Sequence, residues 1–290
     1  MSMGELLNIA AVVLILAAVV SLCRAAFGTS QAALAVPAAN AAAMLLMAAG
    51  FGVRWKYYIE TMNAGWLLAF PVSTFYESAS FFLLALLAAF FFTTCLKRRP
   101  GGPGRLTPGT ARGEALAWCA VDFLAGIGIL ALSLTGISSD PVLFLPSLRS
   151  YWLMAHVCLS FVAYGMFALA AILAVLVLCR AENREENAAR IRALVRAATV
   201  VFTIGGIFFG ALWAQTSWGR FWAWDPKETW AFITWCCYLA LIHFDRNEQL
   251  SQRGLAVFAI VNFLVVIFTF VGVNILFAGL HSYALIRPQP

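Results

Sequence analysis

Long apolar stretches separated by short polar segments run along the whole chain. A helix that crosses a bilayer needs about twenty predominantly apolar residues. Eight stretches approach this length, at 6–27, 33–53, 73–96, 115–137, 151–179, 197–214, 228–245 and 255–278. The pattern predicts an all-α fold, a polytopic transmembrane bundle of about eight spanning helices.

Composition supports a membrane protein and excludes a soluble enzyme with a single anchor. Hydrophobic residues make up 63% of the 290 positions and charged residues only 11%, whereas soluble domains carry about 25% charged residues. No long polar stretch interrupts the apolar runs, so a water-soluble binding or catalytic domain has no room. Any chemistry must take place within the membrane or on its short loops.

The first apolar run lacks the features of a cleaved signal peptide. It follows an acidic start at Glu5 and precedes Arg24 instead of following a basic segment, so we expect it to be retained as the first helix. The seven cysteines contain no Cys-x-x-Cys pair, and most lie in apolar runs. This favours small buried side chains over a disulfide framework or a thiol–disulfide exchange centre.

Positive charge is divided unevenly between the two sets of alternate loops that eight spans create. One set carries thirteen lysines and arginines and the other six, and loops rich in these residues stay on the cytoplasmic side. The richer set consists of Arg24, Lys97, Arg98, Arg99, Arg105, Arg112, Arg180, Arg184, Arg190, Arg192, Arg196, Arg246 and Arg253. The poorer set consists of Arg54, Lys56, Arg149, Arg220, Lys227 and Arg287. We therefore expect both termini, and the loop before the seventh span, on the outer side.

That outer loop is polar and dense in tryptophan. Six of the ten tryptophans lie between Trp213 and Trp235, far more than an even spread would place there. Because tryptophan has a large flat face and one N–H donor, such a cluster can line a site for a flat, apolar molecule with polar edges. The same cluster can also form an aromatic belt at the membrane interface.

The end of the loop carries a helix-start pattern that needs no functional explanation. Asp225 is a favoured N-cap residue, Pro226 suits the first helical position, and Glu228 completes a capping box. Trp218 and Trp222 would share a face if the loop were helical, with Trp224 pointing elsewhere. Two local cations, Arg220 and Lys227, could pair with carboxylates of a ligand, although solvated surface charges are more common.

The chain contains only three histidines, at two expected depths. His156 opens the fifth predicted span and His281 follows the last, so both should lie at the outer face, level with the tryptophan-rich loop. His243 follows Asp225 by 18 residues, which places it about 27 Å deeper along a helix. A lone histidine at a helix end is more often an interfacial residue than a ligand. Paired imidazoles beside aromatic walls nevertheless suit haem iron better than zinc.

Several segments resemble the CcsA/ResC family, the membrane subunits of System II cytochrome c synthase. Residues 218–230 read WGRFWAWDPKETW, which is similar to the tryptophan-rich "WWD" segment of membrane proteins that handle haem. The family's two outer histidine motifs resemble SYWLMAHV at 150–157 and GLHSY at 279–283. Its transmembrane histidine resembles LIH at 241–243, and YES at 76–78 resembles a shorter upstream motif.

The resemblance implies a division of the chain and a set of site residues. Residues 1–64 would form N-terminal transmembrane helices, and residues 65–290 a CcsA-like cytochrome c assembly domain with its WWD loop at about 213–230. The implied axial ligands of haem iron at the outer face are His156 and His281, and His243 would serve a deeper transmembrane haem site. The remaining implied haem-binding residues are Trp218, Trp222, Trp224 and Asp225.

The resemblance also implies an activity and its partners. The chain would act as the haem lyase subunit that presents haem b at the outer face and promotes its thioether attachment to the Cys-x-x-Cys-His motif of apocytochrome c. A ResB/CcsB-type membrane protein would complete the enzyme, and a thioredoxin-like protein would keep the substrate thiols reduced. The expected location is the bacterial cytoplasmic membrane or a thylakoid-type membrane. The alternative is a CcmC-like haem exporter that hands haem to another ligase.

Overall fold

The fold is all-helical in the part of the chain that the structure describes. The structure is a computed structural model, and it describes residues 2–27, 35–62, 65–66, 68–72, 74–95, 108–134, 148–179 and 183–277. Its helices are α1 (Met3–Phe27), α2 (Ala35–Met62), α3 (Phe75–Cys95), α4 (Pro108–Leu134), α5 (Tyr151–Cys179), α6 (Arg184–Phe202), α7 (Gly210–Trp218), α8 (Pro226–Arg246), α9 (Gln252–Ile267) and α10 (Val273–Leu276). Two π-helical segments, η3 (Thr203–Phe209) and η4 (Phe268–Gly272), join α6 to α7 and α9 to α10.

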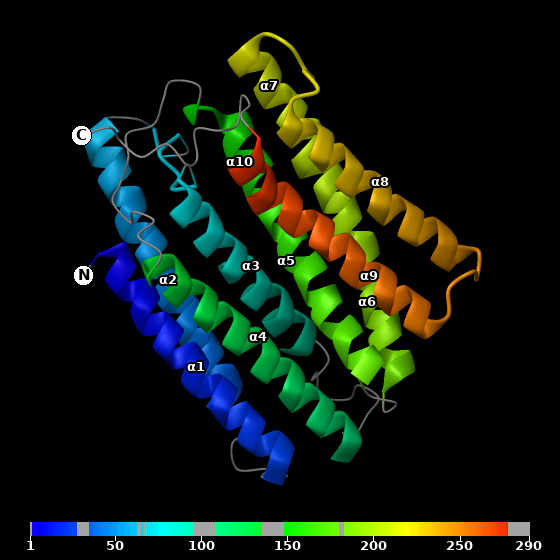
Figure 1. Cartoon of the computed structure of the whole chain (residues 1–290). Coiled ribbons are helices and arrows are strands. Elements are labelled where there is room, and N and C mark those ends of the chain that lie inside the picture. Colours follow the sequence, from blue (N-terminus) through cyan, green and yellow to red (C-terminus); the bar gives the residue numbers. More distant parts are fainter. Residues whose placement is uncertain are drawn as a thin grey trace.

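These elements form eight roughly parallel helical rods in the described part of the chain (Figure 1). Seven rods are long and apolar enough to cross a membrane, which fits the predicted bundle. The eighth, α8, is not among them because its polar and charged residues lower its hydropathy. The predicted sixth span, 197–214, is only part of a continuous rod from Arg184 to Trp218, since the charged segment before it continues the same helix.

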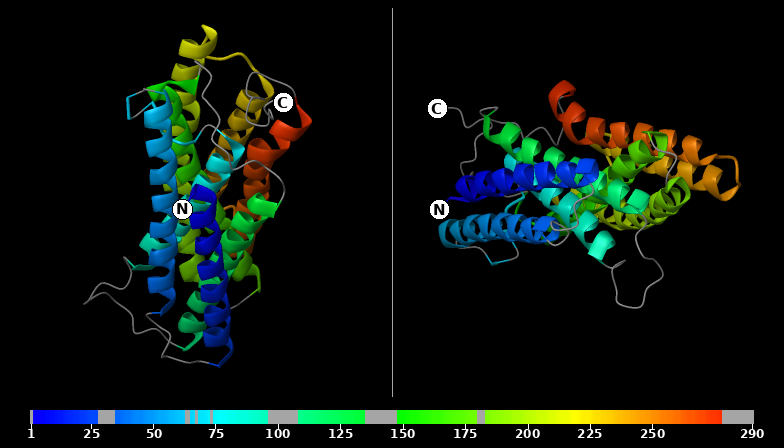
Figure 2. Two further views of the ribbon diagram at one scale, coloured as in Figure 1. Left: turned by 90° about the vertical axis from the view of Figure 1, so that its left-hand side faces the viewer. Right: turned by 90° about the horizontal axis from the view of Figure 1, so that it is seen from below.

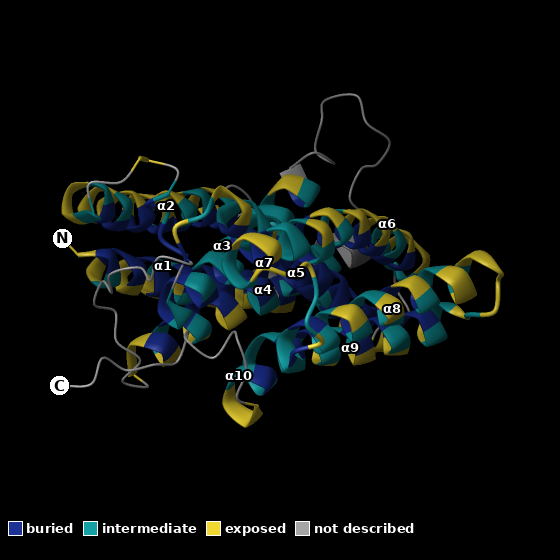
Figure 3. Ribbon diagram, turned by 90° about the horizontal axis from the view of Figure 1, so that it is seen from above, coloured by how far each residue is buried: buried dark blue, intermediate teal, exposed yellow. Residues whose placement is uncertain are grey.

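Helix α5 lies at the centre of the bundle. It packs against α3, α6 and α9, whereas α1 packs against α2 and α4 at one side of the molecule (Figures 1 and 2). In the view from above, buried residues line the inner faces of the rods and exposed residues face outward (Figure 3). Many exposed positions are large hydrophobics such as Leu16, Leu45 and Leu264. An apolar exterior suits lipid as the surrounding solvent, and the chain is an integral membrane protein.

A buried polar network fixes the start of α3 against α2. Thr74 and Glu77 form a reciprocal capping box, in which each side chain accepts from the other's backbone N–H. The Tyr58 hydroxyl donates to Glu77 Oε1 over 2.7 Å, and Arg54 lies 3.7 Å from the same oxygen. Glu77, part of the YES motif, therefore has a structural role.

The contact between α3 and α5 depends on the absence of a side chain at Gly165. A Cβ atom at this position would lie 2.7 Å from the backbone carbon of Ala85 and 2.7 Å from the backbone nitrogen of Leu86. Small residues permit such close helix approach in membrane proteins. The central helix can therefore touch α3 almost backbone to backbone.

We predict that Gly165→Ala lowers the free energy of unfolding by about 1–3 kcal/mol, because backbone atoms cannot move aside as a flexible side chain would. Gly52→Ala on α2 is the matched control, since an added Cβ there meets nothing within 4 Å. The measurement is the unfolding midpoint of each purified variant in detergent. Equal midpoints for the two variants would contradict this account of the α3–α5 contact.

Candidate functional site

The tryptophan-rich loop and the first predicted histidine lie at the same end of the bundle. His156 is in the second turn of α5, and the loop connects α7 to α8 beside it (Figure 1). The rod formed by α9, η4 and α10 also ends here. The expectation of a shared depth for His156 and the loop is therefore met, whichever side of the membrane this end faces.

The imidazole of His156 is held by a backbone carbonyl of a π-helix. Its Nδ1 lies 2.9 Å from the carbonyl oxygen of Gly205, in η3. A carbonyl can only accept, so Nδ1 carries the proton and Nε2 carries the lone pair that a metal ligand requires. An added Cβ at Gly210 would come within 2.9 Å of the same ring nitrogen. Because Gly210 has no side chain, the imidazole of His156 can lie directly against the first turn of α7.

Trp213 forms an aromatic wall beside His156. The two rings are nearly parallel, with an interplanar angle of 11° and centroids 6.2 Å apart. Trp213 is 1% exposed, and Trp218 meets it edge-on with centroids 5.8 Å apart. The imidazole thus belongs to an aromatic cluster at the end of the bundle.

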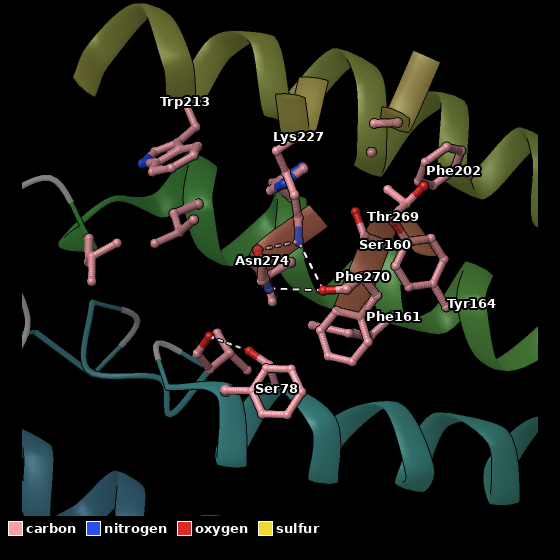
Figure 4. A pocket seen from close by; sticks show the side chains of 18 residues that line it. Ser78, Ser160, Phe161, Tyr164, Phe202, Trp213, Lys227, Thr269, Phe270 and Asn274 are labelled. Carbon is pink, nitrogen blue, oxygen red and sulfur yellow. Dashed lines mark hydrogen bonds between the residues drawn. The ribbon is translucent and has the colours of Figure 1, made fainter. Parts of the chain in front are cut away.

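Two cavities meet at His156. The inner cavity has a volume of about 120 Å³ and extends between α3, α5 and η4 past Phe161, Tyr164 and Phe270 (Figure 4). The loop cavity has a volume of about 40 Å³, and its lining includes Phe221 and Trp222 from the tryptophan-rich loop. Both cavities are lined by His156, Gly206, Trp213, Lys227 and Ala231. Their mostly apolar walls with a few polar groups are typical of small-molecule sites.

The loop itself is not helical beyond Trp218. Helix α7 ends there because Gly219 adopts a left-handed conformation, with φ of 73°. Trp218 and Trp222 therefore do not share a helical face. Trp222 and Trp224 instead meet edge-on, with centroids 5.8 Å apart. Trp224 has a φ of 58° and is 65% exposed, and such left-handed backbone is strained in a residue with a bulky side chain.

Two indole N–H groups in the loop have no acceptor among the described residues. They belong to Trp218 and Trp222, and both nitrogens are buried. A buried donor without an acceptor costs about 1–3 kcal/mol. Trp222 lines the loop cavity, so a molecule with polar edges bound there would supply its missing acceptor. Trp218 lines neither cavity.

Asp225 has the predicted role of starting α8. Its side chain accepts from the backbone N–H of Glu228 over 2.8 Å, and Pro226 follows at the first helical position. The carboxylate of Glu228 does not return to the N-cap residue, as a capping box requires, but accepts from the backbone N–H of Ala223 over 2.6 Å. The pair therefore fixes the loop before the helix as well as the helix start.

His243 lies at the opposite end of α8 from the tryptophan-rich loop. It is exposed, and its Nε2 lies 3.1 Å from Nδ2 of Asn247. Arg192 and Arg196 on α6 form ion pairs with Asp245 over 2.8 Å and 3.4 Å and fix this end of α8. Because α8 is one unbroken helix, His243 cannot share a small site with His156, as the sequence predicted. His281 lies outside the described residues.

Two residues of the site were not predicted from the sequence. Trp213 was part of the tryptophan-dense segment, but nothing in the sequence singled it out as the ring beside His156. Lys227 was weighed both as a partner for ligand carboxylates and as a surface cation, and it lines both cavities. Its position in the first turn of α8 was a usable signal, because a cation there opposes the helix dipole.

Comparison with known proteins identifies the family. The family model described as "Cytochrome C assembly protein" matches residues 6–281. The chain is 30% identical to the cytochrome c biogenesis protein CcsA of Synechococcus sp. (strain CC9902) over 84% of each chain. Identity to the CcsA protein of Pyropia yezoensis is 28%, over 77% of this chain and 82% of the relative. The match to CcsA of Chlamydomonas reinhardtii is 34% identical but spans only 48% of this chain and 42% of the relative.

A solved structure shows the same fold. The cytochrome c haem lyase CcmF superposes with a TM-score of 0.67 at 17% identity, over 99% of this chain and 47% of CcmF. The chain thus spans about half the length of that relative. A family match over most of the sequence and relatives named CcsA assign a role in cytochrome c biogenesis. The chain belongs to the cytochrome c assembly protein family.

Proposed function

We propose that the chain binds haem at the end of the bundle that carries the tryptophan-rich loop and promotes its thioether attachment to apocytochrome c. The observation that carries the proposal is the imidazole of His156, which is held through Nδ1 beside Trp213 where two apolar cavities meet. Haem offers a flat apolar ring, an iron that accepts imidazole nitrogen, and polar edges.

The residues present fit haem as the bound substrate. Nε2 of His156 is the nitrogen suited to iron, since Nδ1 donates to Gly205. The orphaned indole N–H of Trp222, which lines the loop cavity, would donate to the polar edge of the macrocycle. Trp218 would support the Trp213 wall, and Trp224 would cover the exposed face of the macrocycle. Asp225 would act indirectly, by fixing the end of the loop through its cap of α8.

A second axial ligand follows from the sequence and the resemblance. His281 comes after the rod that ends at the same end of the bundle as His156, and we propose it as the ligand on the opposite face of the iron. A histidine of the substrate motif would replace one of the two imidazoles when apocytochrome c binds. The haem would therefore be handed over without a change in the type of iron ligand.

The proposed reaction adds two substrate thiols to the two vinyl groups of haem b. In each addition the thiol S–H bond breaks, the sulfur bonds to one vinyl carbon and the hydrogen to the other, so no electron is gained or lost. This chain supplies position instead of a nucleophile, which agrees with the absence of a Cys-x-x-Cys pair in its sequence. Holding both reactants in place can supply several kcal/mol of barrier lowering.

His243 belongs to a separate, deeper haem site in this proposal. Its exposed position on α8 suits a second ligand supplied by a ResB/CcsB-type partner. The excess of lysine and arginine in the loops at the His243 end supports a cytoplasmic location for it, and an outer location for the tryptophan-rich loop. Haem could then be received inside and used outside, where a thioredoxin-like partner keeps the substrate thiols reduced.

Haem export without attachment is the alternative function. Two histidine sites at different depths suit transport as well as catalysis. Expression of this chain and its partner alone, in cells that lack other cytochrome c maturation proteins, separates the two. We predict covalent haem on a co-expressed apocytochrome c, measured by haem-staining after denaturing electrophoresis. Haem that reaches the outer side but is never attached would identify an exporter instead.

We predict that His156→Ala lowers the yield of holocytochrome c by about tenfold or more. Mutation of a residue that hydrogen-bonds a metal ligand already costs about tenfold in activity, and loss of the ligand itself should cost at least as much. Added imidazole should restore part of the yield, since it can occupy the vacated coordination position. The yield is measured by haem-staining with and without imidazole. Normal holocytochrome c from His156→Ala, without imidazole, would remove His156 from the ligand set.

We predict that Trp222→Phe weakens haem binding by about two- to tenfold, because phenylalanine keeps the aromatic face but removes the N–H donor. Trp66→Phe is the matched control, since Trp66 is 60% exposed and packs against Trp55 away from the cavities. Binding is measured by absorbance titration of the purified chain with haem. An equal effect of both substitutions would argue against hydrogen bonding of haem by Trp222.

A further inference from the structure

Lys227 is a cation enclosed at the point where the two cavities meet. Its Nζ donates to the carbonyl of Phe270 over 3.2 Å and to Oδ1 of Asn274 over 3.0 Å (Figure 4). No carboxylate of the described residues lies within ion-pair distance of it. An ammonium group has three donors, so the two neutral acceptors leave one donor without a hydrogen bond. The charge itself is offset only by the electrostatic attraction of Asp225 and by the Phe270 ring, 5.8 Å away.

The position of Lys227 is unfavourable in the absence of a ligand. It lies in the first turn of α8, where the helix dipole disfavours a positive charge. Enclosure by protein also costs free energy unless the charge is paired. The two acidic residues nearby serve other contacts: Asp225 caps the N–H of Glu228, and Glu228 accepts from Ala223. Asp225 attracts the ammonium electrostatically without forming a direct ion pair with it, so a ligand carboxylate would add a direct pair at this place.

The cavities show where that partner would lie. Lys227 and His156 both line the inner cavity and the loop cavity. A ligand whose metal is bound by His156 would therefore bring its periphery close to Lys227. By contrast Arg220, the other cation of the segment, is exposed and fits a solvated surface charge.

The carbonyl that holds Lys227 comes from the second π-helix. Phe270 is in η4, and its oxygen also accepts from Nδ2 of Asn274 over 2.9 Å. Lys227, Asn274 and the Phe270 carbonyl are thus hydrogen-bonded to one another and link α8 to the η4–α10 segment. This set fixes the ammonium in place before a ligand arrives, which lowers the ordering cost of binding.

We propose that Lys227, positioned by Asn274 and the Phe270 carbonyl, is the binding residue for a carboxylate of the ligand. On the proposed function, which this inference rests on, that carboxylate is a propionate of haem. A carboxylate would accept from the third N–H of the ammonium in a charge-assisted hydrogen bond, while Asn274 and the Phe270 carbonyl keep the other two. Lys227 would thereby set the rotation of the macrocycle about the His156–iron axis, and with it the direction in which the vinyl groups point.

The test compares haem with its dimethyl ester, which keeps the iron and the ring but carries no free carboxylate. Both are titrated into the purified full-length chain by absorbance. The variants are Lys227→Met, Lys227→Arg and the control Lys56→Met, whose side chain is 77% exposed and pairs with Glu60. We expect wild type and Lys56→Met to prefer haem over the ester by about tenfold. Lys227→Met should lose this preference with its ester affinity unchanged, and Lys227→Arg should keep part of it.

The outcomes separate this inference from the proposed function. Equal weakening of haem and ester in Lys227→Met, or an unchanged preference for haem, would overturn the carboxylate role while leaving the haem site intact. No binding of either compound to wild type would reject the haem site and this inference together. Unchanged haem binding with weaker binding of an apocytochrome c peptide would assign Lys227 to a carboxylate of the substrate protein and overturn the propionate assignment.

Discussion

The hydrogen bond from His156 to the carbonyl of Gly205 is the contact on which the site depends. Within a membrane almost every backbone carbonyl is occupied by its own helix, because lipid offers no alternative donor. A side chain can use a carbonyl most readily where the helix departs from α-helical geometry, and π-helical segments are such departures. Segment η3 supplies the carbonyl that orients His156, and η4 supplies the one that holds Lys227.

The same departures shape the space around those side chains. The inner cavity is bounded by Gly206 of η3 and by Thr269 and Phe270 of η4. Each π-helical segment thus supplies a carbonyl that orients a polar side chain, and each also borders the inner cavity.

The sequence predicted the architecture well because apolar length and charged loops determine it directly. The rods, the placement of His156 at the same end as the tryptophan-rich loop, the depth of His243 and the N-cap role of Asp225 could all be anticipated. The sequence did not predict that the charged segment before residue 197 continues the same helix. One face of that segment, with residues such as Ile191 and Val195, is buried against the rest of the bundle. The sequence also did not predict that the rings of His156 and Trp213 stack. This contact depends on the position of the π-helical segment η3 in the rod. For Lys227 the sequence left open a partner for ligand carboxylates and a solvated surface charge, because burial is a property of tertiary packing.

The most direct test of the central claim is the absorption spectrum of the purified complex in its oxidised and reduced forms, recorded for a His243→Ala variant so that only the outer haem contributes. The account predicts a low-spin haem with two imidazole ligands, and loss of that spectrum when His156→Ala is added. A spectrum without bis-imidazole features, or one that survives the loss of His156, would contradict it.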